Sequence, residues 1–351
     1  MCDRAGAELT NLLSPLPDAL LPWFRENARD LPWRRDREPY HVWLSEIMLQ
    51  QTRVEAVKGY YERFLLALPD IKSLADADPE MLNKLWEGLG YYTRVRNLQT
   101  AAKQIMTERG GVFPSDYDAI RALKGVGDYT AGAIASICFD RPVPAVDGNV
   151  LRVVSRVTAD ERPVNEEKTK RAVRDALRTV YPEGHSGAFT QALMELGAVI
   201  CLPNGAPDCA RCPAARFCRS RDGRWRALPV RAAKKNRRRE ELTVFILRSG
   251  ETIAVRKRPN AGLLAGLWEF PNVPGHLSPS DAAAQAERWG ARPASLLRET
   301  RRGHIFTHVE WDMCCYFFDC RAAEETPFAW VSDEELETSV ALPTAFRKCL
   351  A

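Results

Sequence analysis

The chain has 351 residues, of which 45% are apolar, and a formal net charge of +4. This length exceeds that of one ordinary domain, so two domains are expected, and the small charge excess does not by itself indicate a nucleic-acid partner. No apolar stretch reaches the roughly 20 residues of a membrane span, and the N-terminus lacks the pattern of a secretory signal. We expect a monomeric intracellular protein with no membrane partner, in the cytoplasm or at the nucleoid if the source is bacterial, with reduced thiols.

The first part of the chain is expected to be helical. Apolar residues recur near helical spacing over 8–30, and Pro39 opens a strongly apolar helix that extends to Thr52. Further helices, separated by short loops with proline and glycine, are expected at 54–67, 78–87, 93–109, 115–122, 128–138 and 147–158. Because alternating strand patterns are absent from this part, we predict a single all-α domain over 8–220.

The composition changes after residue 220. The range 221–240 is basic and irregular, with six basic residues between Arg231 and Arg239, and we expect an interdomain linker or a phosphate-contacting segment there. Three stretches rich in apolar residues are expected to be strands, at 242–247, 252–256 and 314–318, and one stretch, at 280–289, is expected to be a helix. A second domain of α+β class is therefore predicted over 241–351.

Four of the ten cysteines lie close together in the sequence: Cys201, Cys209, Cys212 and Cys218. Clustered thiols at loop spacing in a reducing compartment indicate a metal site, either tetrathiolate zinc or a [4Fe–4S] cluster. Zinc ribbons usually use two C-x2-C pairs and only one is present here, so the compact run favours the iron–sulfur cluster. Arginines beside these thiols would suit phosphate contact. The other six cysteines, including Cys2, are expected to be buried apolar thiols.

Two carboxylates are candidates for acid–base chemistry. Glu46 lies within an apolar helix, where it either faces solvent or is buried; burial would raise its pKa and let it act as a general acid near neutral pH. Asp147 lies at the start of a predicted helix, where it is either an ordinary N-cap or a fixed negative charge. One protonated and one ionised carboxyl group that face each other can break a glycosidic bond through an oxocarbenium-like state.

A tight turn lies between two of the predicted helices. Gly125 and Gly127 flank Val126 in this turn, and glycine permits the close backbone approach that such a turn needs. The amide N–H groups that follow open a new helix and could bind a phosphate oxygen. Many helix–turn–helix connections contain such a glycine pair, so the pair indicates a function only together with the motifs around it in the sequence.

These features, in this order, resemble the helix–hairpin–helix DNA glycosylases of the endonuclease III superfamily. The Leu-Lys-Gly-Val-Gly turn at 123–127 is followed by Val-Asp-Gly-Asn-Val at 146–150 and then by the four-cysteine loop. The stretches 45–54, 86–92 and 195–198 are similar to the MutY-type adenine glycosylase branch. The resemblance implies an all-α helix–hairpin–helix glycosylase domain with a [4Fe–4S] loop, an α+β Nudix-like C-terminal domain, and double-stranded DNA as the partner.

The resemblance also implies an activity. Enzymes of this branch are monofunctional DNA glycosylases of base excision repair, which hydrolyse the N-glycosidic bond of adenine mispaired with 8-oxoguanine or guanine. Relatives with lyase activity carry a lysine two residues after the second hairpin glycine, where this chain has Tyr129. The alternatives are a glycosylase for mismatched thymine or uracil, whose members generally lack a second domain, and a non-catalytic DNA-damage-binding protein, against which the two carboxylates argue.

The resemblance further assigns roles to single residues. Glu46 would protonate the adenine and later activate water, and Asp147 would stabilise the oxocarbenium ion. Tyr129 and Asn149 would support Asp147.

On the DNA side, Gln51 and Tyr91 would enter the duplex beside the lesion when adenine is flipped out. The hairpin residues that would bind backbone phosphate are Gly125, Val126 and Gly127.

The stretches 262–271 and 304–308 resemble the Nudix-like domain of this family, in which a Phe-Ser-His loop recognises 8-oxoguanine. The corresponding loop here reads Phe306, Thr307 and His308. Threonine keeps the hydroxyl that hydrogen bonding needs, so the recognition role is expected to persist. The helix at 280–289 lacks the glutamates that Nudix hydrolases use to bind Mg²⁺, so no nucleotide pyrophosphohydrolase activity is expected.

Overall fold

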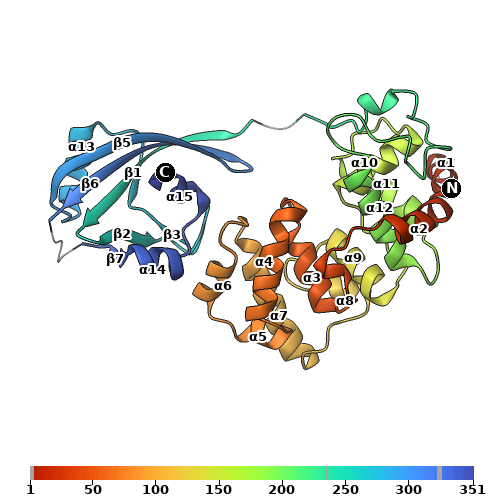
Figure 1. Cartoon of the computed structure of the whole chain (residues 1–351), viewed down its shortest axis with the longest axis horizontal. Coiled ribbons are helices and arrows are strands. Elements are labelled where there is room, and N and C mark those ends of the chain that lie inside the picture. Colours follow the sequence, from red (N-terminus) through yellow and green to blue (C-terminus); the bar gives the residue numbers. More distant parts are fainter. Residues whose placement is uncertain (1–3, 234–235, 322–325) are drawn as a thin grey trace. The chain divides into compact units, whose positions relative to one another are not determined.

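The computed structural model describes residues 4–233, 236–321 and 326–351, whose helices and strands are shown in Figure 1. The chain divides into two compact units, one of residues 1–76 and 97–233 and the other of residues 77–96 and 234–351. Cys2 and two lysines of the basic run lie outside the described residues. No helix among the described residues is long and apolar enough to cross a membrane.

The first unit is helical, as predicted. Its helices are α1 (Arg4–Leu13), α2 (Leu16–Asn27), η1 (Pro32–Arg34), α3 (Pro39–Met48), α4 (Val54–Ala67), α5 (Ile71–Asp76), α7 (Thr93–Arg109, whose first turn belongs to the other unit), α8 (Tyr117–Arg121), α9 (Asp128–Phe139), α10 (Gly148–Thr158), α11 (Glu167–Arg178), α12 (Ser186–Val199) and η2 (Arg224–Arg226). The helix expected over 8–30 is two helices, because Pro15 lies at the junction and cannot continue a helix. The helix expected to reach Thr52 ends at Met48, because Gln51 has a left-handed backbone with φ of +60°.

The helix α12 packs against α2, α9 and α10 in this unit. Gly197 of α12 faces the first turn of α10, and a Cβ on Gly197 would come within 2.6 Å of the Asn149 Cβ. Glycine at this position therefore lets the start of α10 approach α12 closely, which brings residues from distant parts of the sequence together.

The described part of the second unit contains a sheet and four helices, which confirms the α+β prediction. The strands are β1 (Arg238–Ser249), β2 (Thr252–Lys257), β3 (Trp268–Glu269), β4 (Asn272–Pro274), β5 (Pro293–Ile305), β6 (Val309–Cys320) and β7 (Ala329–Ser332), and the helices are α6 (Pro79–Leu85), α13 (Pro279–Arg288), α14 (Asp333–Thr338) and α15 (Thr344–Leu350). The main strand order is β3-β2-β1-β6-β5, with β4 paired to β1 and β7 paired to β2. The β1–β6 pair is parallel.

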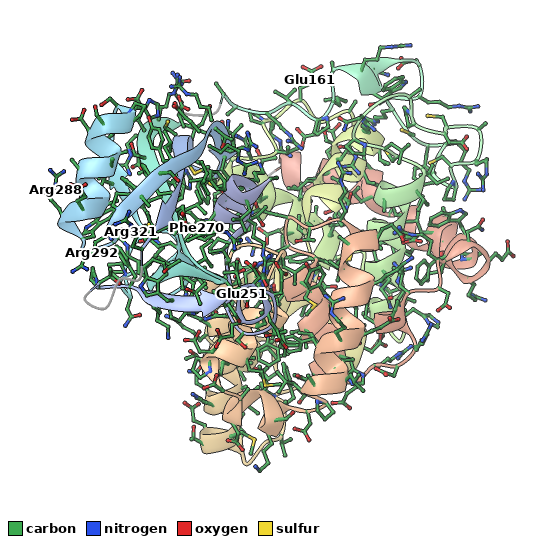
Figure 2. The ribbon with its side chains drawn as sticks, turned by 60° about the vertical axis from the view of Figure 1, so that its left-hand side comes forward. Glu161, Glu251, Phe270, Arg288, Arg292 and Arg321 are labelled. Atoms are coloured by element: carbon green, nitrogen blue, oxygen red, sulfur yellow. The ribbon has the colours of Figure 1, made fainter. Side chains whose placement is uncertain are left out.

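Strand β1 is buried on both faces of the sheet, which explains its continuous apolar sequence. Val244 and Ile246 pack in a core that includes α14 and α15, and Phe245 and Leu247 pack on the opposite face in a core that includes α13. Phe270, labelled in Figure 2, belongs to the first of these cores.

The contacts divide the chain differently from the predicted boundaries. Residues 77–96, expected within the all-α domain of 8–220, group with the C-terminal unit. The first part of the expected linker 221–240 packs against the helical unit, where Leu228 is buried. Strand β1 then begins at Arg238, still inside that range. The basic composition of the range 221–240 did not predict that Leu228 would be buried against the helical unit.

Candidate active site and metal-binding loop

A cavity of about 720 Å³ lies within the helical unit. Its walls come from η1, α3, α9, α10, α11 and α12 and from the turn after α3. Five residues singled out from the sequence line this cavity together: Glu46, Gln51, Tyr129, Asp147 and Asn149. The fold thus gathers the predicted catalytic residues from three separate stretches of the chain.

Glu46 is the buried acid of the cavity. It is only 5% exposed, which excludes the solvent-facing alternative, and its Oε2 accepts a hydrogen bond from the Tyr129 hydroxyl at 2.5 Å. Burial raises the pKa of Glu46 to about 7, although the Tyr129 bond and the Arg34 charge act in the opposite direction. At neutral pH, Glu46 is therefore protonated in a large fraction of the protein molecules.

Asp147 is both the N-cap of α10 and part of the cavity wall. Its Oδ1 accepts a hydrogen bond from the Val150 N–H at 2.7 Å, and its Oδ2 accepts one from Asn149 Nδ2 at 2.7 Å. Burial raises the pKa of Asp147, and these two bonds oppose that rise because they favour the ionised carboxylate. The capping role and a charge-stabilising role are therefore compatible in one residue.

Arg152, which the sequence analysis did not single out, connects the site to the cysteine loop. Its Nη2 donates to Asn149 Oδ1 at 2.8 Å and to Gly197 O at 2.7 Å. Its Nε donates to Cys201 O at 2.8 Å. The buried guanidinium therefore holds the Asn149 amide with its Nδ2 toward Asp147. In the sequence, the only hint is an arginine inside an apolar helix.

A second group of charges in the cavity wall was also missed. Glu195 Oε1 accepts bonds from the Arg29 backbone N–H at 3.0 Å and from Arg29 Nε at 2.7 Å, and Glu195 Oε2 accepts from Arg29 Nη2 at 2.9 Å and from Arg34 Nη2 at 2.8 Å. Burial acts to raise the pKa of Glu195, but the bonds from the two arginines outweigh it and hold the pKa at about 2. Glu195 belongs to the family-like stretch 195–198, whereas Arg29 lies at the end of the stretch expected to be helical and Arg34 lies just beyond it.

The two hairpin glycines differ in their backbone conformation. Gly125 is left-handed with φ of +79°, and a Cβ there would come within 2.6 Å of the Asn97 Cβ, so this position requires glycine. Gly127 has φ of −97° and caps α9, a conformation open to other residues. Val126 is buried and its N–H donates to Leu123 O at 3.1 Å, so this amide is engaged within the turn.

Asp128, the first residue of α9, forms ion pairs with two arginines. Its carboxylate accepts hydrogen bonds from Arg174 of α11 and from Arg121 of α8, which hold its pKa below the ordinary value. Arg174 Nη2 also lies 3.5 Å from Glu167 Oε1. Two carboxylates and two guanidiniums therefore surround the helix start at which phosphate binding was predicted.

The two residues predicted to enter the duplex both have left-handed backbones. The φ angle is +60° at Gln51 and +48° at Tyr91, a conformation that costs energy for residues other than glycine. Gln51 is exposed, and Tyr91 is 48% exposed. The Tyr91 hydroxyl lies 2.7 Å from Thr307 Oγ1, a contact within the second unit that no sequence pattern indicated.

The turn from Phe306 to His308 joins β5 to β6. The half-buried Phe306 ring lies 4.8 Å from the Trp311 ring and 4.5 Å from the His304 ring, measured between centroids. Thr307 and His308 are exposed. The aromatic contacts therefore anchor the turn and leave the next two side chains accessible.

The four predicted metal ligands follow α12 and surround a small cavity. Arg156 Nη1 lies 3.3 Å from Cys201 Sγ. Burial, together with the neighbouring thiols, raises the pKa of Cys212 to about 12 and raises the pKa values of Cys209 and Cys218. These thiols would therefore need a bound cation in order to ionise at neutral pH. Among the other described cysteines, four are buried, as expected: Cys314, Cys315, Cys320 and Cys349; Cys138 is only half-buried.

The spacing of the sulfur atoms can be compared with the ligand spacing around a zinc ion. A tetrahedral zinc with Zn–S bonds of about 2.3 Å holds its sulfurs about 3.8 Å apart. Within the described ranges, the only three metal-ligating side chains whose ligand atoms all lie within 4.8 Å of one another are Glu241, His276 and Asp312. No three of the cysteine sulfurs of the described loop are that close, so they lie further apart than the sulfurs around one zinc ion.

Comparison with known proteins covers both units. Residues 44–182 match the HhH-GPD superfamily of base excision DNA repair proteins, and residues 243–351 match the NUDIX domain. The adenine DNA glycosylases of Mus musculus and Homo sapiens are each 35% identical to this chain. The alignments cover 94% of this chain, 76% of the mouse protein and 72% of the human protein.

Among solved structures, a thermostable thymine-DNA glycosylase is 26% identical with a TM-score of 0.54, and the match covers 63% of this chain and 99% of that one. A trapped endonuclease III–DNA covalent intermediate shows the same fold at 22% identity and a TM-score of 0.53, over 61% of this chain and 98% of that one. The mouse and human proteins, in contrast, align over nearly the whole chain. This chain therefore belongs to the adenine DNA glycosylase family.

Proposed function

We propose that this protein hydrolyses the N-glycosidic bond of adenine mispaired with 8-oxoguanine or guanine in duplex DNA, as part of base excision repair. The observation that supports this most is the pair of carboxyl groups in one cavity: Glu46, with a pKa of about 7, and Asp147, capped by two N–H donors. The cavity volume of about 720 Å³ is sufficient for a flipped purine.

In the proposed reaction, Glu46 donates its proton to a ring nitrogen of the adenine. The base then leaves as neutral adenine with the electron pair of the C–N bond, and the Asp147 carboxylate stabilises the cationic sugar. The ionised Glu46 next accepts a proton from water as the water attacks the sugar carbon, which leaves an abasic site. Burial raises the pKa of Tyr129 well above its usual value, so its hydroxyl keeps its proton and holds Glu46 Oε2.

We expect no efficient strand cleavage from this site. A lysine amine forms a Schiff base with the sugar in bifunctional relatives, and the phenol of Tyr129 cannot do so. Lys170 of α11 does line the cavity, 3.6 Å from Glu167. Borohydride trapping on an abasic duplex is the test. Efficient trapping by the wild type would contradict the proposal, and the Lys170→Ala variant would show whether Lys170 is the responsible amine.

The proposed preference for 8-oxoguanine rests on the second unit. Tyr91 offers a half-exposed ring that can stack on a base, and Thr307 offers a hydroxyl that can bond to a base edge. The 2.7 Å contact between their oxygens places both groups at one point of the surface.

We also propose that the four-cysteine loop holds a [4Fe–4S] cluster, with Cys201, Cys209, Cys212 and Cys218 as ligands. The bound cluster would supply the positive charge that these thiolates need and would cross-link the loop. The sulfur spacing supports this choice over zinc. Iron and sulfide in equal amounts in anaerobically purified protein are expected, and zinc in their place would contradict the proposal.

Single-turnover base release tests the activity. The substrates are duplexes with adenine opposite 8-oxoguanine, guanine, cytosine or thymine, and a duplex with a thymine–guanine mispair. Adenine release opposite 8-oxoguanine and guanine, with retained binding and no release by Glu46→Gln, is the expected result. Faster release of thymine than of adenine would favour the activity named for the thermostable relative, and binding without release would favour a non-catalytic role. Excision by Glu46→Gln would refute the mechanism.

A further inference from the structure

Residues 77–96 lie within the range that matches the glycosylase superfamily, but they pack with the C-terminal unit. This segment contains α6 and the loop with Tyr91. Tyr91, one of the two residues expected to enter the duplex, is therefore carried by the same compact unit as the turn from Phe306 to His308.

Glu87, just after α6, bonds this segment to two parts of the C-terminal unit. Its Oε1 accepts hydrogen bonds from the Leu342 backbone N–H at 3.1 Å and from Arg347 Nε at 2.6 Å. Its Oε2 lies 2.7 Å from Lys84 Nζ, which in turn donates to Val340 O at 3.2 Å. The Glu87 side chain is 13% exposed, so these charge-assisted bonds are largely shielded from water.

Glu80 of α6 makes a second and weaker attachment. Its carboxylate accepts hydrogen bonds from Lys257 Nζ and, at 3.2 Å, from Trp268 Nε1. The Glu80 side chain is 39% exposed, and exposed ion pairs contribute little because water screens them. Glu87 is therefore the stronger link between α6 and the C-terminal part of the unit.

The loop that follows has an uncommon backbone. Gly88, Gly90 and Tyr91 have φ angles of +96°, +71° and +48°. At Tyr91 this conformation is strained, so surrounding contacts must maintain it. The Arg94 guanidinium lies 5.6 Å from the Tyr91 ring centre, and the Tyr91 hydroxyl meets Thr307 Oγ1 at 2.7 Å. A shift of the loop's first residues would change where this ring and hydroxyl lie.

We infer that Glu87 is a positioning residue that keeps the Tyr91 loop in register with the turn from Phe306 to His308, so that Tyr91 and Thr307 meet DNA as one surface. It does so through Arg347 and the Leu342 N–H. The inference rests on the proposed function, in which these two residues contact the lesion. Loss of the Glu87 charge should therefore weaken the discrimination between 8-oxoguanine and guanine opposite adenine, while the chemistry in the helical unit continues.

The test uses the full chain with Glu87→Gln, which keeps the shape of the side chain and one acceptor oxygen. Arg347→Gln removes the partner and provides a second variant if the first fails to fold. Glu337→Gln is the matched control, because Glu337 also pairs with Arg347, at 2.7 Å, but lies in α14 outside the 77–96 segment. Single-turnover excision is measured on duplexes with adenine opposite 8-oxoguanine or guanine, and 2-aminopurine beside the mispair reports entry of the Tyr91 ring.

We expect E87Q and R347Q each to reduce the preference for 8-oxoguanine at least about fivefold and to weaken the 2-aminopurine signal. Their rates on the 8-oxoguanine duplex at saturating enzyme should stay within about twofold of the wild type. The double variant should lose less than the sum of the two single effects, because both single variants disturb the Glu87–Arg347 ion pair. An unchanged preference in E87Q and R347Q, an equal loss in E337Q, or additive effects would overturn the inference. A wild type that excises adenine without preference for 8-oxoguanine would refute the proposed 8-oxoguanine recognition by the second unit, and one that excises no adenine would refute the proposed function instead.

Discussion

Replacement of Glu195 by glutamine gives a quantitative test of the cavity wall. The Glu195 oxygens accept bonds from Arg29 and Arg34, and its pKa is about 2, against 4.5 for the free side chain. A pKa difference of about 2.5 corresponds to about 3.4 kcal/mol of folding free energy, and removal of one partner from a buried ion pair costs about 3–5 kcal/mol. We expect E195Q to lower the free energy of unfolding by about 3 kcal/mol at neutral pH.

The pH dependence of this effect follows from the direction of the pKa shift. The pKa of Glu195 is lower in the folded state, so the unfolded chain takes up a proton first as the pH falls. The stabilisation is complete above about pH 4.5 and is lost as the pH falls toward about 2. The stabilities of the wild type and E195Q should therefore converge over this range.

Urea unfolding followed by helical circular dichroism, at several pH values between about 7 and 3, measures this convergence. The control is Glu55→Gln, because Glu55 is an exposed carboxylate paired with Lys58 on α4; its effect should stay below about 1 kcal/mol. A difference between wild type and E195Q that stays constant with pH, or one no larger than that of E55Q, would refute the reasoning.

Three further measurements test the site. The excision rate should fall as the pH rises through about 7, where Glu46 loses its proton. Tyr129→Phe should move this fall to higher pH, because the hydrogen bond from Tyr129 lowers the pKa of Glu46. A pH–rate profile that does not move would contradict the hydrogen bond between Tyr129 and Glu46. Gly197→Ala places a Cβ within 2.6 Å of the Asn149 Cβ and should slow single-turnover excision by about tenfold or more, whereas an unchanged rate would show that Asn149 need not stay in place. Cys212→Ser should lower the bound iron and expose the loop to limited proteolysis, and full iron content would exclude Cys212 as a ligand.

The helical part of the fold could be predicted in detail where proline and glycine separate periodic stretches. The helices α4 and α7 have the predicted bounds of 54–67 and 93–109. Strand β5 could not be found, because most of its residues are exposed and its apolar side chains, such as Leu297 and Ile305, do not face a core. A strand held mainly by backbone bonding to its neighbour leaves no alternation in the sequence.

The candidate site could be predicted only where a residue type is unusual for its setting. An acid inside the apolar α3 singled out Glu46, and the structure places it in one cavity with Tyr129, while the catalytic roles of both remain predictions. Arg29, Arg34 and Arg152 could not be selected, because the sequence does not distinguish an arginine that is paired in the fold from a solvated one. Their partners lie far away in the sequence and only the folded chain brings them together.

The ion pairs of Asp128 have a consequence for the ionic-strength dependence of DNA affinity. Cations that neutralise phosphates release condensed counterions, and each such contact steepens the decrease of affinity with salt. Arg121 and Arg174 are already paired with Asp128 and Glu167, so these two arginines beside the hairpin should add little to this slope. Asp128→Asn should make the slope of log affinity against log salt concentration steeper by about one, so that the variant binds more tightly in dilute buffer and loses this advantage as salt is added.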